Sequence, residues 1–413
     1  MSALRTAEAW GWRVAAAASR HPRRAALLAV LVTLAVALVA TTVPATAGDP
    51  AAPRRADARR AADDVAAVGW THVCTVRSDG GAWCSGYNDF GQLGDGRSTS
   101  SYLPVRVAGA QRWRGVGVGG NHSCGLTTED ALFCWGSNGS GQLGVGDTSM
   151  RSVPTQVPGL WKQLALGYRS TCATDQEDRA WCWGSGADGR LGTGSTSDSL
   201  VPTAVAGDRH FVSLSSLNGT VCGVIRTGTA FCWGDNGSGQ VGDGTVTDAL
   251  VPTRVPGDQD WSQVSAGSRH TCGTTTSGAA WCWGEASDGQ ITGRASNVPV
   301  RTPTVVSDRG WRELHAGSNV TCGLSARSQV WCWGQGSDGQ VADMRSLVGV
   351  RLPTREATLQ RWSDLSVGSS SVCATRQDDG RLFCWGYNPN GMLGVGMDAS
   401  PRYGPTPVVL PRG

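Results

Sequence analysis

Short stretches in which apolar and small residues alternate recur along most of the chain. In residues 113–120, Val116 and Val118 alternate with glycines, and comparable stretches begin near residues 63, 161, 211, 261, 311 and 362. Apolar side chains two residues apart are typical of a β-strand that buries one face. Each stretch is therefore expected to form the first strand of a repeated unit.

Three further strands are expected in each unit. Residues 122–127 and 131–136 are the second and third strands of one unit, and the short polar segment between them predicts a hairpin turn. A proline is expected to open the fourth strand, because an edge strand does not need the N–H that proline lacks. These prolines are Pro104, Pro154, Pro202, Pro252, Pro303, Pro353 and Pro405.

Fourteen cysteines mark the same period. They form seven pairs, and the first members of successive pairs are 48 to 51 residues apart. The pairs are Cys74 and Cys84, Cys124 and Cys134, Cys172 and Cys182, Cys222 and Cys232, Cys272 and Cys282, Cys322 and Cys332, and Cys373 and Cys384. Such a period indicates a solenoid, an array or a propeller, so residues 63–413 are expected to form one repeated domain.

The expected hairpin turns midway between the two cysteines of a pair. Side chains directly opposed on neighbouring strands approach to about 4.5–5.5 Å at Cβ, close to disulfide range. We therefore favour one disulfide within each hairpin, with pairing between neighbouring repeats as the alternative. Zinc is disfavoured because the chain has no CxxC pair, and neither a metal nor another cofactor is expected.

Aromatic residues flank the second cysteine in six of the seven units, as Phe133 and Trp135 flank Cys134. The strand period of two places both rings on one face of the third strand and the cysteine on the other. We expect these rings to pack between neighbouring sheets, and favour this interpretation over a carbohydrate-stacking role.

The first 47 residues differ in kind from the repeats. Five arginines precede the apolar run 25–43, and Ala45 and Ala47 supply the small side chains of a signal-peptidase site. The run is close to the ~20 residues that span a bilayer, so a signal anchor is the alternative to a cleaved signal peptide. Residues 48–62 lack apolar periodicity and are expected to form a flexible tether. The protein is therefore expected to be extracytoplasmic, either secreted or anchored by residues 25–43.

The positive charge of the sequence lies in this N-terminal part. The whole chain has 36 Lys and Arg against 33 Asp and Glu, whereas residues 63–413 hold 27 basic and 30 acidic residues. The repeats therefore give no reason to expect a nucleic-acid-binding face, and no nucleic acid is predicted as a partner.

The run HSCGLTTEDALFCWGSNGSGQLG at residues 122–144, followed by Pro-Thr-x-Val, resembles the repeat of the regulator of chromosome condensation family. That repeat has an HxCAL-like strand, a Trp-Gly pair, an NxxGQLG loop and a later PxxV, and the resemblance covers residues 63–413. It implies an all-β fold, a seven-bladed β-propeller of four-stranded blades.

The resemblance implies a fold and leaves the function open. The founding member of the family is a nuclear exchange factor for a small GTPase, but no segment here matches its nucleotide-releasing loop. Secreted bacterial propellers of similar repeats include an inhibitor of β-lactamases, which favours a propeller that binds a protein or cell-surface ligand through one rim. We expect a monomer. A regulator of a small GTPase that resembles the exchange factor, and a hydrolase or lyase with an unrecognised site, are the alternatives.

Candidate catalytic groups are few, and we expect no enzymatic activity. His72, His122 and His270 share one repeat position, two residues before the first cysteine, which indicates a structural slot. His315 stands in a slot that holds Ala, Gly or Ser in the other units, so it is the candidate to face a central channel. The sequence has no GxSxG, HExxH or P-loop motif.

With antiparallel strands, the first and third connections of each unit emerge on one rim of the propeller. The third connections are long and vary most, and variable loops on a rigid scaffold are where recognition is usually built. Tyr, Arg and Met are enriched in protein interfaces. The ligand-binding candidates of these types are Arg97, Tyr102, Met150, Arg151, Arg294, Met344, Arg345, Met397 and Tyr403.

Overall fold

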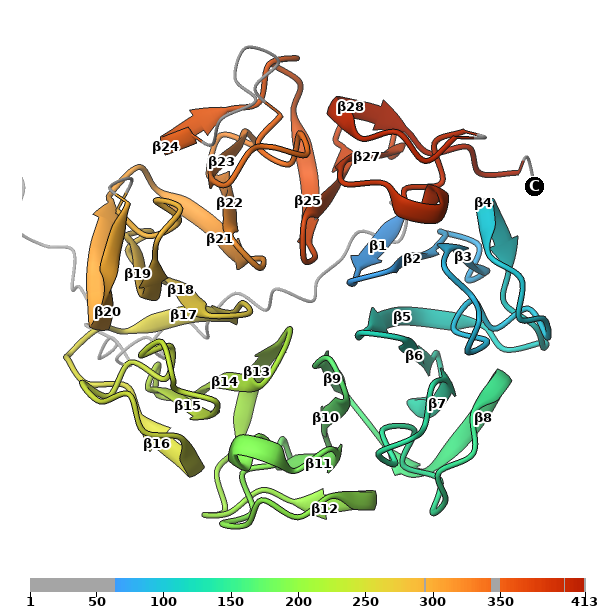
Figure 1. Cartoon of the computed structure of the whole chain (residues 1–413), viewed down its shortest axis with the longest axis horizontal. Helices are drawn as coiled ribbons and strands as arrows, with labels where there is room; N and C mark the ends of the chain where they lie inside the picture. The colour runs from blue at the N-terminus through green and yellow to red at the C-terminus, as the bar shows by residue number, and fades with distance from the viewer. Residues whose placement is uncertain (1–63, 293–294, 343–349, 397, 412–413) are drawn as a thin grey trace, which may run out of the picture. The chain divides into compact units, whose positions relative to one another are not determined.

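The computed structural model describes residues 64–292, 295–342, 350–396 and 398–411. Seven four-stranded antiparallel sheets follow one another around a ring, and each sheet takes its strands from one repeat in chain order (Figure 1). This confirms the predicted seven-bladed propeller. The expected signal, residues 1–47, and the expected tether, residues 48–62, lie outside the described residues. Within the described part of the chain, no helix has the length and apolar character needed to span a bilayer.

The first two strands of each blade, strands A and B, form its inner half (Figure 1). The A strands are β1 Val65–Val68, β5 Trp113–Val118, β9 Gln163–Leu166, β13 Phe211–Ser216, β17 Trp261–Ala266, β21 Trp311–Ala316 and β25 Trp362–Val367. The B strands are β2 His72–Val76, β6 His122–Thr127, β10 Ser170–Thr174, β14 Thr220–Ile225, β18 His270–Thr275, β22 Val320–Ser325 and β26 Ser371–Arg376.

Strands C and D form the outer half of each blade, with D at the circumference (Figure 1). The C strands are β3 Ala82–Gly86, β7 Ala131–Gly136, β11 Ala180–Gly184, β15 Ala230–Gly234, β19 Ala280–Ala286, β23 Val330–Gly334 and β27 Leu382–Gly386. The D strands are β4 Ser101–Arg106, β8 Arg151–Leu160, β12 Ser199–Ala204, β16 Ala249–Arg254, β20 Ser296–Ser307, β24 Val350–Arg355 and β28 Arg402–Pro407. Two short 3-10 turns, η1 Ala187–Gly189 and η2 Pro389–Gly391, lie in C–D loops.

Every hairpin of strands B and C is closed by its own disulfide. Cys124 lies directly opposite Cys134 in the register of β6 with β7, with their Cα atoms 4.1 Å apart. The other six pairs repeat this geometry, and no described cysteine is free. The predicted pairing within hairpins is confirmed, and pairing between repeats does not occur.

The prediction that a proline opens strand D was wrong. Strand β4 begins three residues before Pro104, and its register with β3 shifts between Cys84 and Gly86. All seven D strands shift register at the corresponding point. The proline therefore lies in a β-bulge inside the strand, where the ladder is interrupted and no N–H is needed.

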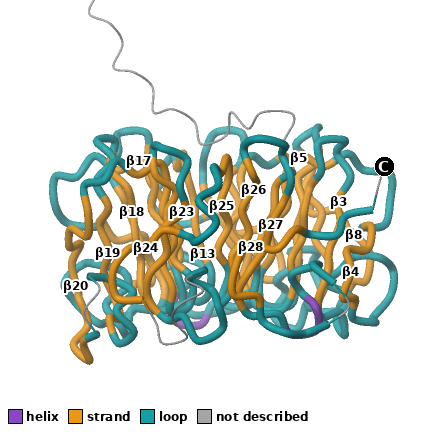
Figure 2. Tube along the Cα trace, turned by 90° about the horizontal axis from the view of Figure 1, so that it is seen from above, coloured by secondary structure: helices purple, strands orange, loops and turns teal. Residues whose placement is uncertain are grey.

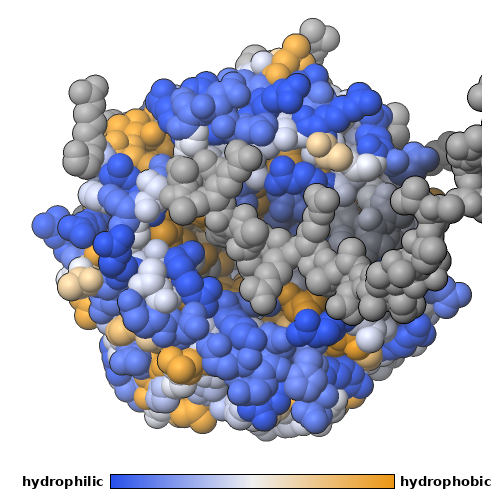
Figure 3. Space-filling model, turned by 180° about the vertical axis from the view of Figure 1, so that it is seen from behind, coloured by the Kyte–Doolittle hydropathy of each residue, from blue (hydrophilic) through white to orange (hydrophobic). Residues whose placement is uncertain are grey.

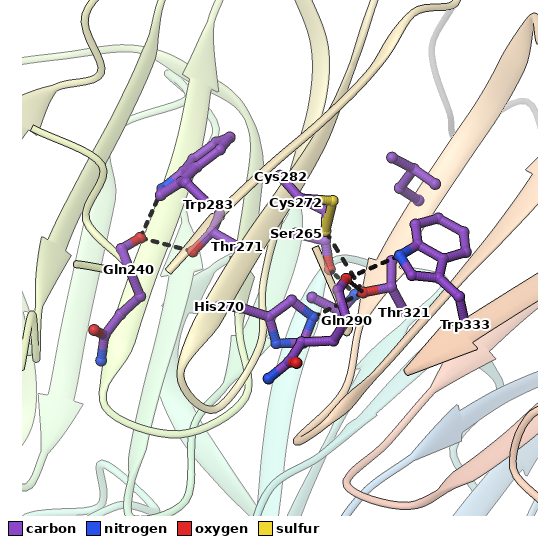
Figure 4. The surroundings of a disulfide bond; sticks show 12 residues. Gln240, Ser265, His270, Thr271, Cys272, Cys282, Trp283, Gln290, Thr321 and Trp333 are labelled. Atoms are coloured by element: carbon purple, nitrogen blue, oxygen red, sulfur yellow. Dashed lines mark hydrogen bonds between the residues drawn. A yellow bond between two sulfur atoms is a disulfide. The ribbon is translucent and has the colours of Figure 1, made fainter. Parts of the chain in front are cut away.

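The tryptophans that follow the second cysteine pack between neighbouring blades, as predicted. Trp333 is fully buried, and its Nε1 donates to the main-chain oxygen of Gln290 in the preceding blade at 2.9 Å (Figure 4). The Thr321 hydroxyl donates to the same oxygen at 2.9 Å. In the first blade Ser85 replaces the tryptophan, and its hydroxyl donates to the Met392 oxygen of the last blade at 2.8 Å.

The ring is closed by packing of the last blade against the first, without exchange of a strand. The N–H of Val68 in β1 donates to Ser366 Oγ in β25 at 3.2 Å. An apolar cluster with members Val68, Val73, Leu382 and Leu393 spans the two blades. Each described sheet is complete within its own repeat, so closure depends on these side chains and on a main-chain hydrogen bond from the Ser369 N–H to the Gly69 oxygen at 3.3 Å.

Candidate functional site

The loops form two distinct rims. The A–B turns and C–D loops make one, called here the C–D rim, and the B–C hairpin tips and D–A connectors make the other, the hairpin rim. Figure 2 shows both 3-10 turns of the C–D loops at the same edge of the ring. Within the C–D rim the Tyr87 N–H donates to the Thr71 oxygen, and within the hairpin rim the Trp113 N–H donates to the Gly80 oxygen. The connections thus lie as the strand order predicts.

A buried asparagine holds the shape of four C–D loops. Asn138 Oδ1 accepts the Leu143 N–H at 3.0 Å, and its Nδ2 donates to the oxygens of Asp147 at 2.8 Å and Ser149 at 3.0 Å. Asn88, Asn236 and Asn388 make equivalent bonds. Loops held in this way can present side chains in fixed positions.

The described binding candidates lie in blades 1, 2 and 7. Arg97 and Met150 are exposed on their loops, and 55% of Met150 is accessible. Arg151 braces its own loop instead, because its guanidinium donates to Asp147 Oδ2 at 2.6 Å and to the Ser149 oxygen at 2.7 Å. This contact lowers the pKa of Asp147. Arg294, Met344, Arg345 and Met397 lie outside the described residues.

Tyr102 and Tyr403 each pack on a glycine of the preceding blade while remaining 37% and 41% exposed. A Cβ added at Gly391 would lie 2.5 Å from the Tyr102 ring, and one at Gly339 would lie 2.9 Å from the Tyr403 ring. The equivalent position in other blades holds Ser152, Leu200, Leu250 and Arg301. The contact between blades therefore does not require a tyrosine ring.

Five further aromatic residues of the C–D rim were missed by the sequence reasoning: Trp70, Tyr87, Phe90, Tyr168 and Tyr387. Trp70 and Tyr168, from the A–B turns of blades 1 and 3, have ring centroids 5.2 Å apart. Trp70 Nε1 also donates to the Leu217 oxygen of blade 4 at 3.1 Å. Because these blades are not adjacent to blade 1, the two rings meet across the channel mouth. Their signal in the sequence was an aromatic residue where most repeats have a polar residue or glycine.

His72, His122 and His270 occupy a buried structural slot, as predicted. Each Nε2 lies 2.7–2.9 Å from a hydroxyl of the next blade. Because each hydroxyl donates its own proton to a main-chain oxygen, it accepts from the Nε2–H of a neutral ring. Burial lowers the pKa to about 3 for His72 and His122 and to about 4 for His270.

His315 lies on strand β21, with its Nε2 3.6 Å from Glu313 Oε2 and a quarter of its side chain exposed. The same slot in blades 5 and 7 holds Ser265 and Ser366, whose hydroxyls accept N–H groups of the next A strand. His315 Nε2 has no hydrogen-bond partner among the described residues. No group of side chains suited to hold a metal ion occurs in that part of the chain.

Comparison with protein families matches the chain to the regulator of chromosome condensation (RCC1) repeat. One model of this repeat matches residues 79–126, 129–174, 177–216 and 227–273, and a second matches residues 113–142 and 261–290. A search of curated protein sequences gave no match.

Solved structures of similar fold include Prp20p of Saccharomyces cerevisiae, with a TM-score of 0.71 over 79% of this chain and 85% of that one. Human WBSCR16 aligns with a TM-score of 0.72 over 80% of this chain and 94% of that one. The ectodomain of the receptor kinase CR4 from Physcomitrella patens aligns with a TM-score of 0.51 over 79% and 74%. All three are 20% identical to this chain, so the likeness shows the fold alone.

Proposed function

Since this chain belongs to the RCC1 repeat family, we propose that it is a non-enzymatic, extracytoplasmic propeller that binds a protein or cell-surface ligand through its C–D rim. The fold is one on which proteins bind other proteins: a solved structure shows yeast RCC1 (Prp20) bound to Kap60, and a study of Prp20p concerns its binding to Gsp1p and histones. The choice of rim and of compartment comes from this chain's own residues.

The distribution of exposed aromatic rings carries the proposal. Among the described residues, every exposed Phe, Tyr or Trp side chain lies on the C–D rim: Phe90, Tyr102, Tyr168, Tyr387 and Tyr403. The large apolar residues exposed at the hairpin rim are aliphatic, such as Leu160 and Leu359. Figure 3 shows the face that points away from the viewer in Figure 1. Where grey atoms do not cover it, this face is mostly hydrophilic with separate apolar patches. Aromatic residues contribute strongly to protein interfaces, so the C–D rim is the better binding surface.

The disulfides support the extracytoplasmic part of the proposal. Seven disulfides persist in an oxidising compartment, whereas thiols are kept reduced where cytosolic GTPases work. Because the disulfides favour an oxidising compartment, a role like that of the exchange factor for a cytosolic GTPase is disfavoured for this chain.

Capture of ligands from a cell-surface fraction with the purified oxidised protein tests the proposal. A captured ligand is expected to lose affinity at least about tenfold when Tyr102, Arg151 and Tyr403 are changed together to Ala, with an unchanged circular dichroism spectrum. Because Arg151 also holds the shape of its loop, a second variant, Tyr102→Ser with Tyr403→Ser, removes the two rings and leaves that loop intact. Loss of binding in Glu129→Ala with Asp378→Ala, on the hairpin rim, would contradict the choice of rim.

Assays with hydrolase and lyase substrates test the enzymatic alternative. We expect no turnover above that of a His315→Ala variant. Turnover that this substitution abolishes would replace the binding function with a catalytic one.

A further inference from the structure

We propose that blades 7 and 1 of the C–D rim bind a positively charged, arginine-bearing segment of the protein partner. The proposal rests on the proposed function and adds the chemistry of the partner. It concerns five aromatic residues, called here the aromatic sector: Tyr87, Phe90 and Tyr102 in blade 1, and Tyr387 and Tyr403 in blade 7.

The aromatic sector extends across the junction of the first and last blades. Tyr102 packs on Gly391, which lies in the C–D loop that begins with Tyr387. The Tyr87 and Phe90 rings have centroids 6.2 Å apart. Tyr387 is 44% exposed and Phe90 37% exposed. Aromatic surface is thus available on two adjacent blades.

The fold does not require aromatic rings at these positions. Other repeats have only polar residues in place of Phe90: Ser140, Asp188, Ser238, Asp288, Asp338 and Asn390. The position of Tyr87 and Tyr387 holds Ser137, Ser185, Asp235, Glu285 and Gln335 elsewhere. The repeat folds with polar side chains at these positions, so the fold does not explain the exposed rings of blades 1 and 7. A partner that covers this surface explains them.

The described loops of the C–D rim, taken over the whole ring, carry an excess of carboxylates. The described A–B turns and C–D loops hold Asp89, Asp95, Asp147, Asp188, Asp198, Asp235, Asp243, Asp248, Asp288, Asp338 and Asp398. The arginines of these loops are Arg97, Arg169, Arg190 and Arg269, of which Arg190 pairs with Asp188 and Arg269 with Glu285 of β19. Arg151 and Arg402, at the starts of β8 and β28, pair with Asp147 and Asp398. In the blade 1 loop this leaves Asp89 and Asp95 against Arg97. Inside the sector the Tyr87 hydroxyl donates to Asp89 Oδ2 at 2.8 Å, a contact that raises the pKa of Tyr87. Asp89 and Asp95 beside exposed aromatic rings, on a rim with more carboxylates than arginines, favour a cationic partner.

Arginine suits this combination of groups better than lysine. Its guanidinium stacks on aromatic faces and binds carboxylates in a bidentate manner, whereas the lysine ammonium acts as a point charge. One exposed cation–π contact changes affinity by about two- to fivefold, so three such contacts amount to tenfold or more.

Fluorescence anisotropy with labelled ten-residue peptides tests the proposal on the oxidised full-length protein. One peptide alternates glycine with arginine, a second has lysine in place of arginine, and a third has glutamate. We expect the arginine peptide to bind most tightly, the glutamate peptide least, and the arginine affinity to fall as salt is raised. The variant Phe90→Ser, Tyr102→Ser, Tyr387→Ser is expected to bind the arginine peptide about tenfold more weakly. Leu160→Ser with Leu359→Ser, on the hairpin rim, is the matched control and should bind as the wild type does.

Equal affinity for the arginine and glutamate peptides, or unchanged binding by the aromatic variant, would overturn the proposal. An oligomer of N-acetylglucosamine serves as a neutral probe: its binding, lost in the aromatic variant while the arginine peptide does not bind, would assign the sector to a glycan instead. A captured cell-surface ligand that needs the C–D rim but binds independently of salt would reject the cationic segment and leave the proposed function intact. A ligand that needs only the hairpin rim would reject both.

Discussion

Lowering the pH from 8 to 5 is expected to destabilise the propeller through its three buried histidines. Their native pKa values, about 3 for His72 and His122 and about 4 for His270, lie below the ordinary value near 6.5 because burial disfavours the charged ring. Between pH 6.5 and 4 the unfolded chain therefore binds more protons than the native one. The free energy of unfolding therefore has its full value above pH 6.5 and decreases as the pH falls from 6.5 to 4.

The magnitude at pH 5 depends mainly on the unfolded chain, because all three native pKa values lie well below 5. At pH 5 the imidazoles are protonated in the unfolded chain and neutral in the native one. This lowers the free energy of unfolding by about 2 kcal/mol per histidine relative to pH 8, or by about 6 kcal/mol for three. The aspartates with lowered pKa values, such as Asp147 and Asp398, affect stability below about pH 4.5, and therefore do not contribute to the comparison between pH 8 and pH 5.

Denaturant unfolding of the oxidised protein, followed by tryptophan fluorescence at pH 8, 6.5 and 5, measures the effect. The matched variant carries threonine, the residue at the Thr220 position, in place of His72, His122 and His270. The variant loses packing at every pH, so only the change in its free energy of unfolding between pH 8 and pH 5 reports protonation. We expect this change to be about 6 kcal/mol in the wild type and below about 1 kcal/mol in the variant. A wild-type stability that does not change between pH 8 and 5, or a variant that keeps the full loss, would refute the reasoning.

Three further predictions concern the scaffold. Peptide mapping of the oxidised protein should give only links within a hairpin, such as Cys124 to Cys134, and removing one pair as Cys124→Ala with Cys134→Ala should cost about 2–3 kcal/mol in denaturant unfolding; a link between repeats would contradict it. A chain that begins at residue 63 should show the melting temperature of the longer chain in calorimetry, since every described blade draws its four strands from one repeat; a large decrease would mean that residues 48–62 complete the ring. Asn138→Ala should cost about 2 kcal/mol and speed hydrogen exchange in residues 137–150, because several buried backbone groups lose their partner; unchanged exchange would show that the loop is held by other contacts.

The sequence alone determined the repeat, the order of strands and the hairpin disulfides. These features depend on neighbours along the chain: side chains alternate every two residues within a strand, and a short turn sets which residues of two strands face each other. For this reason Cys124 and Cys134 could be paired, and Trp135 could be assigned to the interface between blades, before any coordinates were known.

Only the tertiary structure decided which residues of different repeats meet. Trp70 contacts Tyr168 and the oxygen of Leu217, 147 residues away, because the ring brings the A–B turns of blades 1, 3 and 4 to one channel mouth. Arg151 was expected to face a ligand but braces its own loop. Tyr102 meets blade 7 because the ring closes after seven blades. Contacts of this kind depend on how the blades tilt and pack around the ring. That arrangement is set by the packing of whole sheets and cannot be read from any local pattern of residues.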